Sequence, residues 1–451
     1  MRAEGERMQG LVGIPGCKFR PTGYGCELCR RLLVKRTMKY NYICASLFFI
    51  ANIASAASGD WPQWRGPNHD DISAESGLLK EWPEGGPKLV WEAKGLGDGY
   101  SSVSISGDRI FTAGEKGPES FVEALNLADG KAVWSAKLGK SGAVGQPQFE
   151  GPRATPTTDG ELVFAVSQWG EMACYKAATG QEVWRKDYTK DFGGACPFWG
   201  YAESPLIDGD KVVITPGGSQ GALVALNKKT GAVIWQSKEF TDAAHYSSLI
   251  ITELGDVRQY IQLTPSSVAG VAAADGKLLW KAPRKGNVAV IPTPICDNGF
   301  VYVTSGYGAG CNLFKVTPDS GKFSVEQVYA NKVMVNHHGG VIKIGDYVYG
   351  YSENKGWTCQ NFKTGEVKWQ EKEKLGKGSI AYADGHFYLR REDGKGTAAL
   401  IEASPDGYRE HGRFDQPDRS DKNSWPHPVI AGGKLYLRDQ DVLLCYDVKS
   451  K

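Results

Sequence analysis

A short phrase that recurs every 40 to 51 residues narrows the possible folds of this chain more than any other feature. Each clear copy contains a Thr-Gly or Asp-Gly pair and, four residues after the glycine, a tryptophan. Five clear copies cover residues 125–134, 175–184, 226–235, 271–280 and 360–369. Two degenerate copies lead to Tyr329 and Phe414, where the period predicts them. Repeats of this length are typical of propellers and solenoids.

The interior of each repeat indicates which of these two folds to expect. Strand-like runs are opened by Gly-Asp or Asp-Gly turns at 107–108, 159–160, 209–210, 345–346 and 384–385. Such dipeptides favour tight hairpin turns. The 57 glycines and the low charged fraction of 23% are unlike the composition of a helical bundle or coiled coil. Four antiparallel strands in about 45 residues make one propeller blade.

The number of blades follows from the copies. Seven end near residues 134, 184, 235, 280, 329, 369 and 414, and an eighth over 425–447 lacks its outermost strand. Residues 88–91 read as an outermost strand with no blade before it. We expect this strand to complete the last blade, which leaves no open sheet edge. The predicted fold is an all-β, eight-bladed propeller over 88–451, preceded by an N-terminal segment over 57–87.

The sequence from Met38 has the features of a secretory signal peptide. Lys39 precedes an apolar stretch over 43–53, which ends in Ala54-Ser55-Ala56. This stretch is about half of the ~20 residues that a membrane-spanning helix needs. We expect 38–56 to be a signal peptide cleaved after Ala56, 1–37 to be an over-extended or disordered segment, and the protein to be periplasmic or secreted. A single-pass anchor with a basic tail is the alternative.

Charge argues against nucleic-acid binding. Residues 1–56 hold nine Lys or Arg and three Asp or Glu, so the remaining chain has 44 basic and 48 acidic residues, a net charge of −4. The phosphate backbone of a nucleic acid requires a basic surface.

The cysteines do not resemble a disulfide framework. Cys174, Cys359 and Cys445 share one position on the third strand of separate blades, where a small buried residue is expected. Disulfides among them would require the cores of separate blades to meet. The pairing of Cys196, Cys296 and Cys311 stays open. The pair at 26 and 29 lacks the further ligands of a zinc site.

These repeats resemble the quinoprotein-type, or PQQ-like, β-propeller family over residues 60–447. The resemblance implies that the repeat tryptophans pack between neighbouring blades, with Tyr329 and Phe414 as substitutes. The matching tryptophans are Trp91, Trp134, Trp184, Trp235, Trp280 and Trp369. Residues 60–67, Asp-Trp-Pro-Gln-Trp-Arg-Gly-Pro, are similar to a segment of secreted members of the family. Those members commonly have glycine where this chain has Asp71.

Two functions follow from the resemblance. Quinoprotein dehydrogenases oxidise alcohols or sugars with PQQ, which Ca²⁺ holds at the propeller axis. This chain has no Cys-Cys pair and no cluster of Asp, Asn and Glu that matches their calcium ligands, and Ca²⁺ needs six or more oxygen ligands. Assembly factors of the BamB type bind partner proteins without a cofactor. We therefore expect a monomeric, cofactor-free binding or scaffold module, with a PQQ- and Ca²⁺-dependent dehydrogenase as the alternative.

A ligand, either a protein or a small molecule, is expected at one mouth of the central channel. Polar and aromatic residues just before the innermost strands can point into that mouth, and histidine is both a common metal ligand and a proton shuttle. The alternative is a set of polar loops around water. His337 and His338 are a weak metal pair, because adjacent strand residues point to opposite faces. The candidates are Tyr100, Arg153, Trp199, Tyr201, Glu203, His245, Tyr246, His337, His338, Trp425 and His427.

Overall fold

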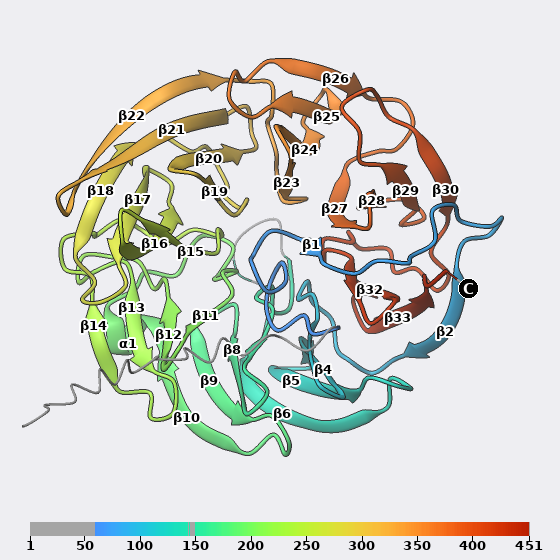
Figure 1. Ribbon diagram of the computed structural model, residues 1–451. Coiled ribbons are helices and arrows are strands. Elements are labelled where there is room, and N and C mark those ends of the chain that lie inside the picture. Colours follow the sequence, from blue (N-terminus) through green and yellow to red (C-terminus); the bar gives the residue numbers. More distant parts are fainter. Residues whose placement is uncertain (1–58, 143, 145–148, 451) are drawn as a thin grey trace, which may run out of the picture. The chain divides into compact units, whose positions relative to one another are not determined.

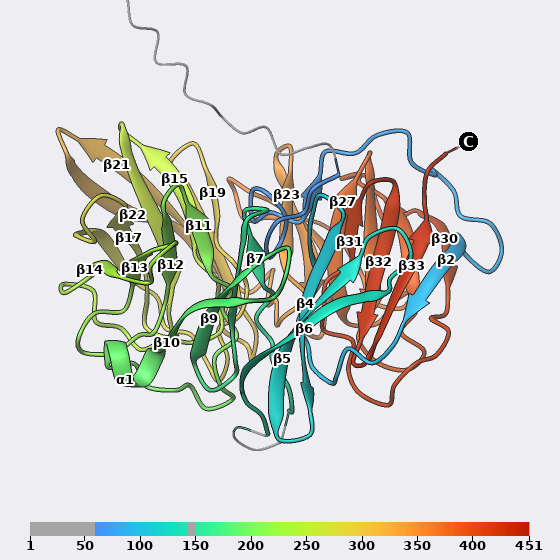
Figure 2. The same cartoon turned by 90° about the horizontal axis from the view of Figure 1, so that it is seen from below.

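Eight antiparallel sheets stand around a common axis and form a closed ring. The computed structural model describes residues 59–142, 144 and 149–450 (Figures 1 and 2). The segment over 1–37, with its cysteines at 26 and 29, and the leader predicted over 38–56 lie outside the described residues. Each blade has four antiparallel strands, and in one blade a short fifth strand from the N-terminal segment pairs parallel with the innermost strand. The predicted eight-bladed β-propeller is therefore confirmed.

The blades follow the chain, with the innermost strand of each first. Blade 1 contains β3 (Ser104–Ser106), β4 (Arg109–Lys116), β5 (Glu119–Asn126) and β6 (Ala132–Lys140). Blade 2 contains β7 (Thr157–Thr158), β8 (Leu162–Val166), β9 (Glu171–Lys176) and β10 (Glu182–Asp187), followed by the short helix α1 (Tyr188–Phe192). Blade 3 contains β11 (Leu206–Asp208), β12 (Lys211–Ile214), β13 (Val224–Asn227) and β14 (Val233–Gln236). Blade 4 contains β15 (Ile250–Leu254), β16 (Val257–Leu263), β17 (Ser267–Ala272) and β18 (Leu278–Pro283).

The second half of the ring repeats this order. Blade 5 contains β19 (Ile295–Asp297), β20 (Phe300–Ser305), β21 (Gly310–Asp319) and β22 (Lys322–Asn331). Blade 6 contains β23 (Val341–Ile344), β24 (Tyr347–Ser352), β25 (Gly356–Asn361) and β26 (Val367–Glu371). Blade 7 contains β27 (Gly378–Ala383), β28 (His386–Arg391), β29 (Ala398–Glu402) and β30 (Glu410–Phe414). Blade 8 contains β31 (Val429–Ala431), β32 (Lys434–Asp439) and β33 (Val442–Asp447).

The fourth strand of blade 8 comes from the N-terminal end of the propeller sequence. Strand β2 (Lys88–Ala93) pairs antiparallel with β33, with Lys88 opposite Asp447 and Trp91 opposite Cys445. The predicted closure of the ring by the N-terminal strand is confirmed. In the described part of the chain, no helix is both long enough and apolar enough to cross a membrane.

An irregularity in the outer strand orients each repeat aromatic. In all eight blades the register between the third and fourth strands shifts close to that residue. In blade 2, Trp184 lies opposite Cys174 and Glu182 opposite Tyr175, so Val183 is the extra residue of a β-bulge. Cys359 and Cys445 face Trp369 and Trp91 in the same way. The three cysteines are buried in separate blades, as predicted, and all six described cysteines are free.

The repeat aromatics cover the glycine turns of the next blade. A Cβ on Gly180, whose φ is 71°, would lie 2.7 Å from the indole of Trp134, and Nε1 of Trp134 donates to Ala177 O at 2.8 Å. The same position lets Trp91, Trp184, Trp235, Tyr329 and Phe414 cover Gly130, Gly231, Gly276, Gly365 and Gly86. The buried core thus lies between neighbouring blades, where Phe164 and Trp184 pack with Val212 and Ile214.

Trp280 departs from this arrangement. Its Nε1 donates to Oε1 of Gln259 within its own blade, at 2.6 Å. The turn that follows in blade 5 belongs to a degenerate copy, and its Gly321 has open space around it. Trp280 instead joins the apolar cluster that contains Val301 and Phe314 of blade 5.

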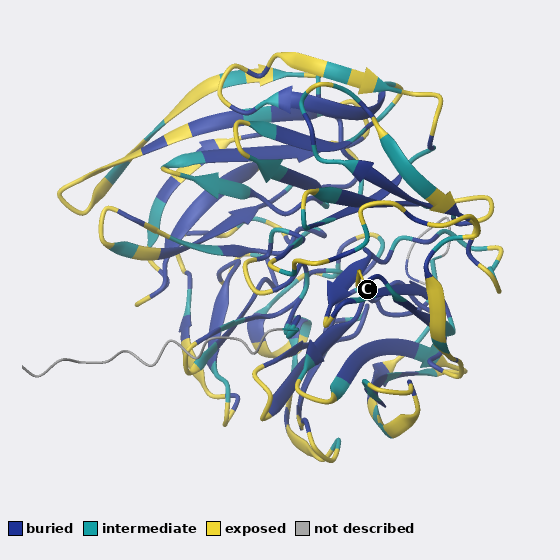
Figure 3. Cartoon of the chain, turned by 45° about the vertical axis from the view of Figure 1, so that its right-hand side comes forward, coloured by how far each residue is buried: buried dark blue, intermediate teal, exposed yellow. Residues whose placement is uncertain are grey.

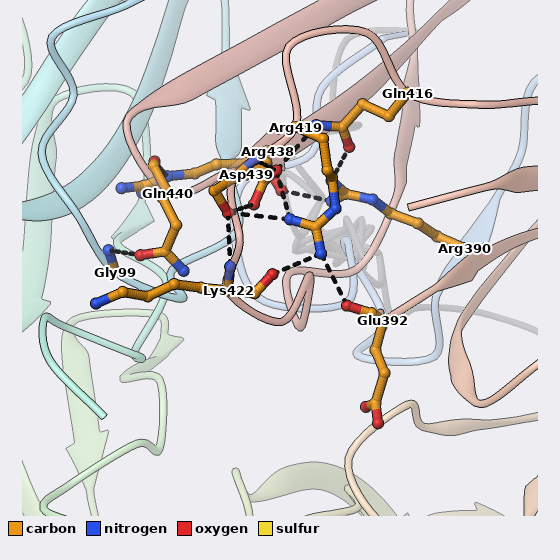
Figure 4. Close-up of polar contacts among 10 residues, drawn as sticks. Gly99, Arg390, Glu392, Gln416, Arg419, Lys422, Arg438, Asp439 and Gln440 are labelled. Atoms are coloured by element: carbon orange, nitrogen blue, oxygen red, sulfur yellow. Dashed lines mark hydrogen bonds and ion pairs between the residues drawn. The ribbon is translucent and has the colours of Figure 1, made fainter. Parts of the chain in front are cut away.

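Buried arginines join the last blades to the first. Arg438, on β32, donates to Ala113 O at 2.7 Å and to Gly97 O at 3.0 Å, across the seam between blades 8 and 1. Arg390, at the equivalent place on β28, donates to Arg438 O. The carboxylate of Asp439 lies 2.6 Å from Nη1 of Arg419 (Figure 4). This network joins blades 7, 8 and 1 across the seam.

The N-terminal segment crosses one end of the ring (Figure 1). Trp61 forms a bridge with Ile105 in blade 1, and Pro62 O accepts from the backbone N–H of Thr158 in blade 2. Strand β1 (Ile72–Ser73) then pairs parallel with β27 of blade 7. The segment also contacts hairpin turns, since Gly432 N–H donates to Glu75. It therefore closes the centre of the ring at the end where these turns lie.

Candidate functional site

A cavity of about 300 Å³ lies on the propeller axis, on the side of the N-terminal segment that faces into the ring. Every blade contributes to its wall, and most of these residues come just before an innermost strand, which brings eight loops to one mouth. Trp64 supplies the contribution of the N-terminal segment. The lining residues are Trp64, Tyr100, Phe149, Arg153, Trp199, Ala202, Ser204, Tyr246, Ser248, Ala289, Ile291, Tyr307, His337, His338, Lys377, Asn423 and Trp425.

Aromatic rings form most of the wall. The ring centroids of Tyr100 and Trp425 are 4.5 Å apart, and those of Trp199 and Tyr246 are 6.1 Å apart. The ring of His338 lies 5.1 Å from Trp425. Flat aromatic faces bind other rings by offset or edge-to-face contact, with centroids 4.5–7 Å apart. The cavity is thus suited to a molecule with a flat apolar body.

Arg153 is the cation of this wall that has no acidic partner. Its Nη2 donates to Phe149 O, while its Nη1 is buried without a hydrogen-bond partner. Within the described ranges no carboxylate forms an ion pair with this guanidinium. Burial lowers the pKa of Arg153 to about 10, so the side chain remains charged at neutral pH.

On the opposite part of the wall, charges are compensated. Nζ of Lys377 lies 2.6 Å from Nδ1 of His337 and 3.3 Å from Oε1 of Glu392. Burial lowers the pKa of His337 to about 2, so the ring is neutral and its Nδ1 accepts a hydrogen bond from the lysine ammonium. Burial opposes the ionisation of Glu392, but His338 and Lys377 outweigh it and lower its pKa to about 2. Lys377 and Glu392 therefore form a neutral pair.

Seven of the residues singled out in the sequence line the cavity. They are Tyr100, Arg153, Trp199, Tyr246, His337, His338 and Trp425. Three others lie behind the wall and serve the packing. Glu203 accepts from Thr215 N–H at 2.7 Å and from the Tyr188 hydroxyl at 3.0 Å, and burial raises its pKa to about 8. The Tyr201 hydroxyl donates to Pro216 O, and Nδ1 of His245 accepts from Val290 N–H.

His427 also lies behind the wall, where it anchors the N-terminal segment. Its Nδ1 is 2.8 Å from Oδ2 of Asp71, and that same oxygen is 3.1 Å from Nε of Arg65. All three side chains are buried. Asp71 has a φ of 58°, in the left-handed region that favours glycine. At position 71, where secreted members of the family commonly have glycine, the aspartate therefore forms an ion pair that glycine could not form.

Several lining residues were not predicted. Trp64 lies in the segment 60–67 that carries the family resemblance, but its sequence gives no sign that it reaches the cavity. Lys377 and Asn423 occupy the same kind of position as the predicted residues, before β27 and β31. Tyr307 comes from the turn between β20 and β21, which a rule based on innermost strands does not cover.

The residues present do not fit a Ca²⁺–quinone site. The described lining contains no carboxylate, and Asn423 is its one side-chain amide. Over residues 59–142, 144 and 149–450, no three or more His, Cys, Asp or Glu side chains gather as metal ligands would. Ca²⁺ requires six to eight oxygen ligands, mostly carboxylates and carbonyls.

In comparison with known proteins, the family model and the curated relatives name the same family. The family model described as outer membrane protein assembly factor BamB matches residues 118–371, more than half of the chain. The BamB of Yersinia pestis is 22% identical over 389 residues, which cover 82% of this chain and 91% of that protein. The BamB of Bordetella pertussis is 24% identical over 270 residues, or 49% of this chain and 64% of that protein.

Solved structures show the same fold. BamB from Moraxella catarrhalis superposes with a TM-score of 0.57 at 15% identity and covers 80% of this chain and 99% of its own. A quinohemoprotein alcohol dehydrogenase from Comamonas testosteroni gives 0.62 at 10% identity, over 88% of this chain and 82% of its own.

Proposed function

The chain belongs to the family described as outer membrane protein assembly factor BamB, and on this basis we propose that it is an exported binding or scaffold module of the cell envelope. Its partners are proteins, and it acts as a monomer in the periplasm or at the envelope. Because the cavity wall lacks the oxygen ligands that Ca²⁺ needs, the quinoprotein dehydrogenase alternative receives no support from the site.

The observation that supports a protein partner lies on the outer rim of the ring. Exposed stretches are frequent on the outer strands of the blades (Figure 3). Six outermost strands expose aliphatic side chains close to the repeat aromatic, with 39–51% of each residue accessible. They are Leu89, Val90, Val133, Val183, Val233, Ile234, Val328 and Val367. Five of them, such as Val183 and Ile234, occupy the bulge, which points them outward. Exposed apolar residues thus recur at one position of the outermost strand in six blades, and apolar surface that protein partners cover is of this kind.

Site-specific cross-linking tests this function. A photo-reactive phenylalanine analogue at Val183 or Val233, on neighbouring outermost strands, should form adducts in living cells with outer-membrane assembly proteins identified by mass spectrometry. The matched control places the analogue at Lys285, which is exposed in the loop between β18 and β19. Equal adducts at all three positions, or none at the two valines, would contradict the proposal.

Export is tested separately. Expression from Met38 in a Gram-negative host should yield a periplasmic protein whose intact mass matches a chain that begins at Ala57. A protein that keeps residues 38–56, or that stays in the cytoplasm, would overturn the proposed location without affecting the binding proposal.

A further inference from the structure

The unpaired polar atoms of the cavity wall are mostly donors. Among the described lining residues, Nη1 of Arg153, Nε1 of Trp199 and Nε1 of Trp425 are buried without a hydrogen-bond partner. Guanidinium and indole nitrogens can only donate. A buried donor without a partner destabilises the protein that contains it, and a ligand that supplies an acceptor removes this penalty. The wall therefore favours a ligand rich in acceptors.

The charge of the wall favours an anion. Lys377 is balanced by Glu392, at 3.3 Å, while Arg153 has no acidic partner in the described chain. His337 and His338 are buried, which favours their neutral forms. One positive charge is therefore left at the cavity, next to aromatic surface that cannot solvate it as water does. A carboxylate bound to this guanidinium would form a charge-assisted and potentially bidentate pair.

The shape and chemistry of the wall favour an aromatic ring over a sugar. Two aromatic pairs, Tyr100 with Trp425 and Trp199 with Tyr246, line the cavity. A sugar would bring several hydroxyl hydrogens that need acceptors. Of the unpaired buried atoms in the wall, only Nδ1 of His338 can accept, because Nε2 of that ring faces Glu392 at 2.5 Å.

We propose that the cavity binds a small planar aromatic monocarboxylate without a metal ion, its carboxylate held by Arg153 and its ring by the aromatic pairs. A volume of about 300 Å³ is at the lower end of small-molecule sites and suits one or two fused rings. This ligand site lies on the axis, away from the rim to which protein partners are assigned. It is therefore independent of the proposed scaffold function.

Calorimetric titration in EDTA tests the proposal. The probes are benzoate, quinoline-2-carboxylate and 2-naphthoate, with 2-naphthamide as the uncharged analogue of the last. The carboxylate of naphthoate should increase affinity about tenfold or more over the amide, as expected for a buried charge-assisted hydrogen bond. Arg153→Gln should remove this difference, while the exposed Arg409→Gln, whose side chain pairs with Glu402, should leave it unchanged.

Each other outcome contradicts a part of the proposal. Equal binding of naphthoate and naphthamide, or no binding of any probe, would overturn the anion site. Tighter binding of glucuronate than of naphthoate would overturn the aromatic ring, and binding that requires added Ca²⁺ would overturn metal independence. If Arg153→Gln fails to fold by circular dichroism, the comparison of the two naphthalene probes on the unmodified protein still decides. Trp199→Leu should weaken the binding of 2-naphthoate and of 2-naphthamide equally.

Discussion

The carboxylate of Asp71 lies 2.8 Å from the imidazole of His427, although 356 residues separate them in the sequence. Asp71 belongs to the segment that crosses the ring, and His427 belongs to the loop before the innermost strand of the last blade. Both side chains are buried, and Arg65 completes the group. This pairing fixes the segment beneath the cavity and places Trp64 against His427, with ring centroids 4.5 Å apart.

We predict that Asp71→Asn destabilises the protein. Asparagine tolerates the left-handed backbone of this position, so the substitution removes charge with little added strain. It leaves the buried guanidinium of Arg65 without its carboxylate, which costs about 3–5 kcal/mol. Urea unfolding followed by tryptophan fluorescence measures the loss. Asp108→Asn is the control, because Asp108 is 79% exposed in its pair with Arg109 and should cost below about 1 kcal/mol. Equal losses in the two variants would contradict a special role for Asp71.

Contact between an indole and the next glycine turn gives a second prediction. Gly180→Ala would place a methyl group 2.7 Å from the ring of Trp134, at a φ of 71°. Left-handed strain and overpacking together should cost about 2–5 kcal/mol. Gly209→Ala is matched in backbone, with a φ of 60°, but has open space around it, and should cost only about 1–2 kcal/mol. Thermal unfolding measures the stability of both variants. If Gly209→Ala proves as unstable as Gly180→Ala, the contact with the ring of Trp134 is unimportant.

The buried carboxyl of Glu203 predicts a pH dependence. Burial raises its pKa to about 8, above the ordinary value near 4.5, so the folded protein binds a proton that the unfolded chain releases. Stability should therefore fall as the pH rises from about 4.5 through about 8. Glu203→Gln imitates the protonated form and should stabilise the protein at pH 8.5 by about 1–4 kcal/mol but not at pH 4.5. Chemical denaturation at both values tests this, and an equal effect of the substitution at the two pH values would argue against the shifted pKa.

The seam between blades 8 and 1 gives a fourth prediction. Arg438→Met removes the donors to Ala113 O and Gly97 O and leaves these buried carbonyls unpaired, which should cost about 3 kcal/mol or more. Hydrogen exchange should accelerate most in β4 and β32, the strands that Arg438 joins across the seam. Arg409→Met, at an exposed pair, is the control. Uniform acceleration in all eight blades would indicate a general loss of stability rather than an opening of the seam.

The repeats were sufficient to predict the blades, because each copy carries its own turns, strand pattern and docking aromatic. Prediction was less complete where a copy is degenerate: Gly321 in the turn of blade 5 has open space around it, and Trp280 donates to Gln259 of its own blade. For the site, position before an innermost strand selected residues such as Arg153 and Trp199, which line the cavity. The same rule could not separate Glu203 from Ser204, because neighbouring residues of an extended loop point in opposite directions and one of them enters the wall. Contacts such as Asp71 with His427 depend on how the segment crosses the ring, which no local pattern encodes.

Completion of blade 8 by β2 affects the order in which the protein can assemble. Trp91 cannot pair with Cys445, its partner in the sheet, until the 354 residues that follow Trp91 have been synthesised and exported. Until then the first strand has exposed backbone groups and apolar side chains, which are prone to pair with other chains. Among the pairs of strands in the described chain, this pair is the most distant in sequence, and such closures are slow. A chain that stops before residue 442 would lose a strand at each end at once, because β2 would have no partner.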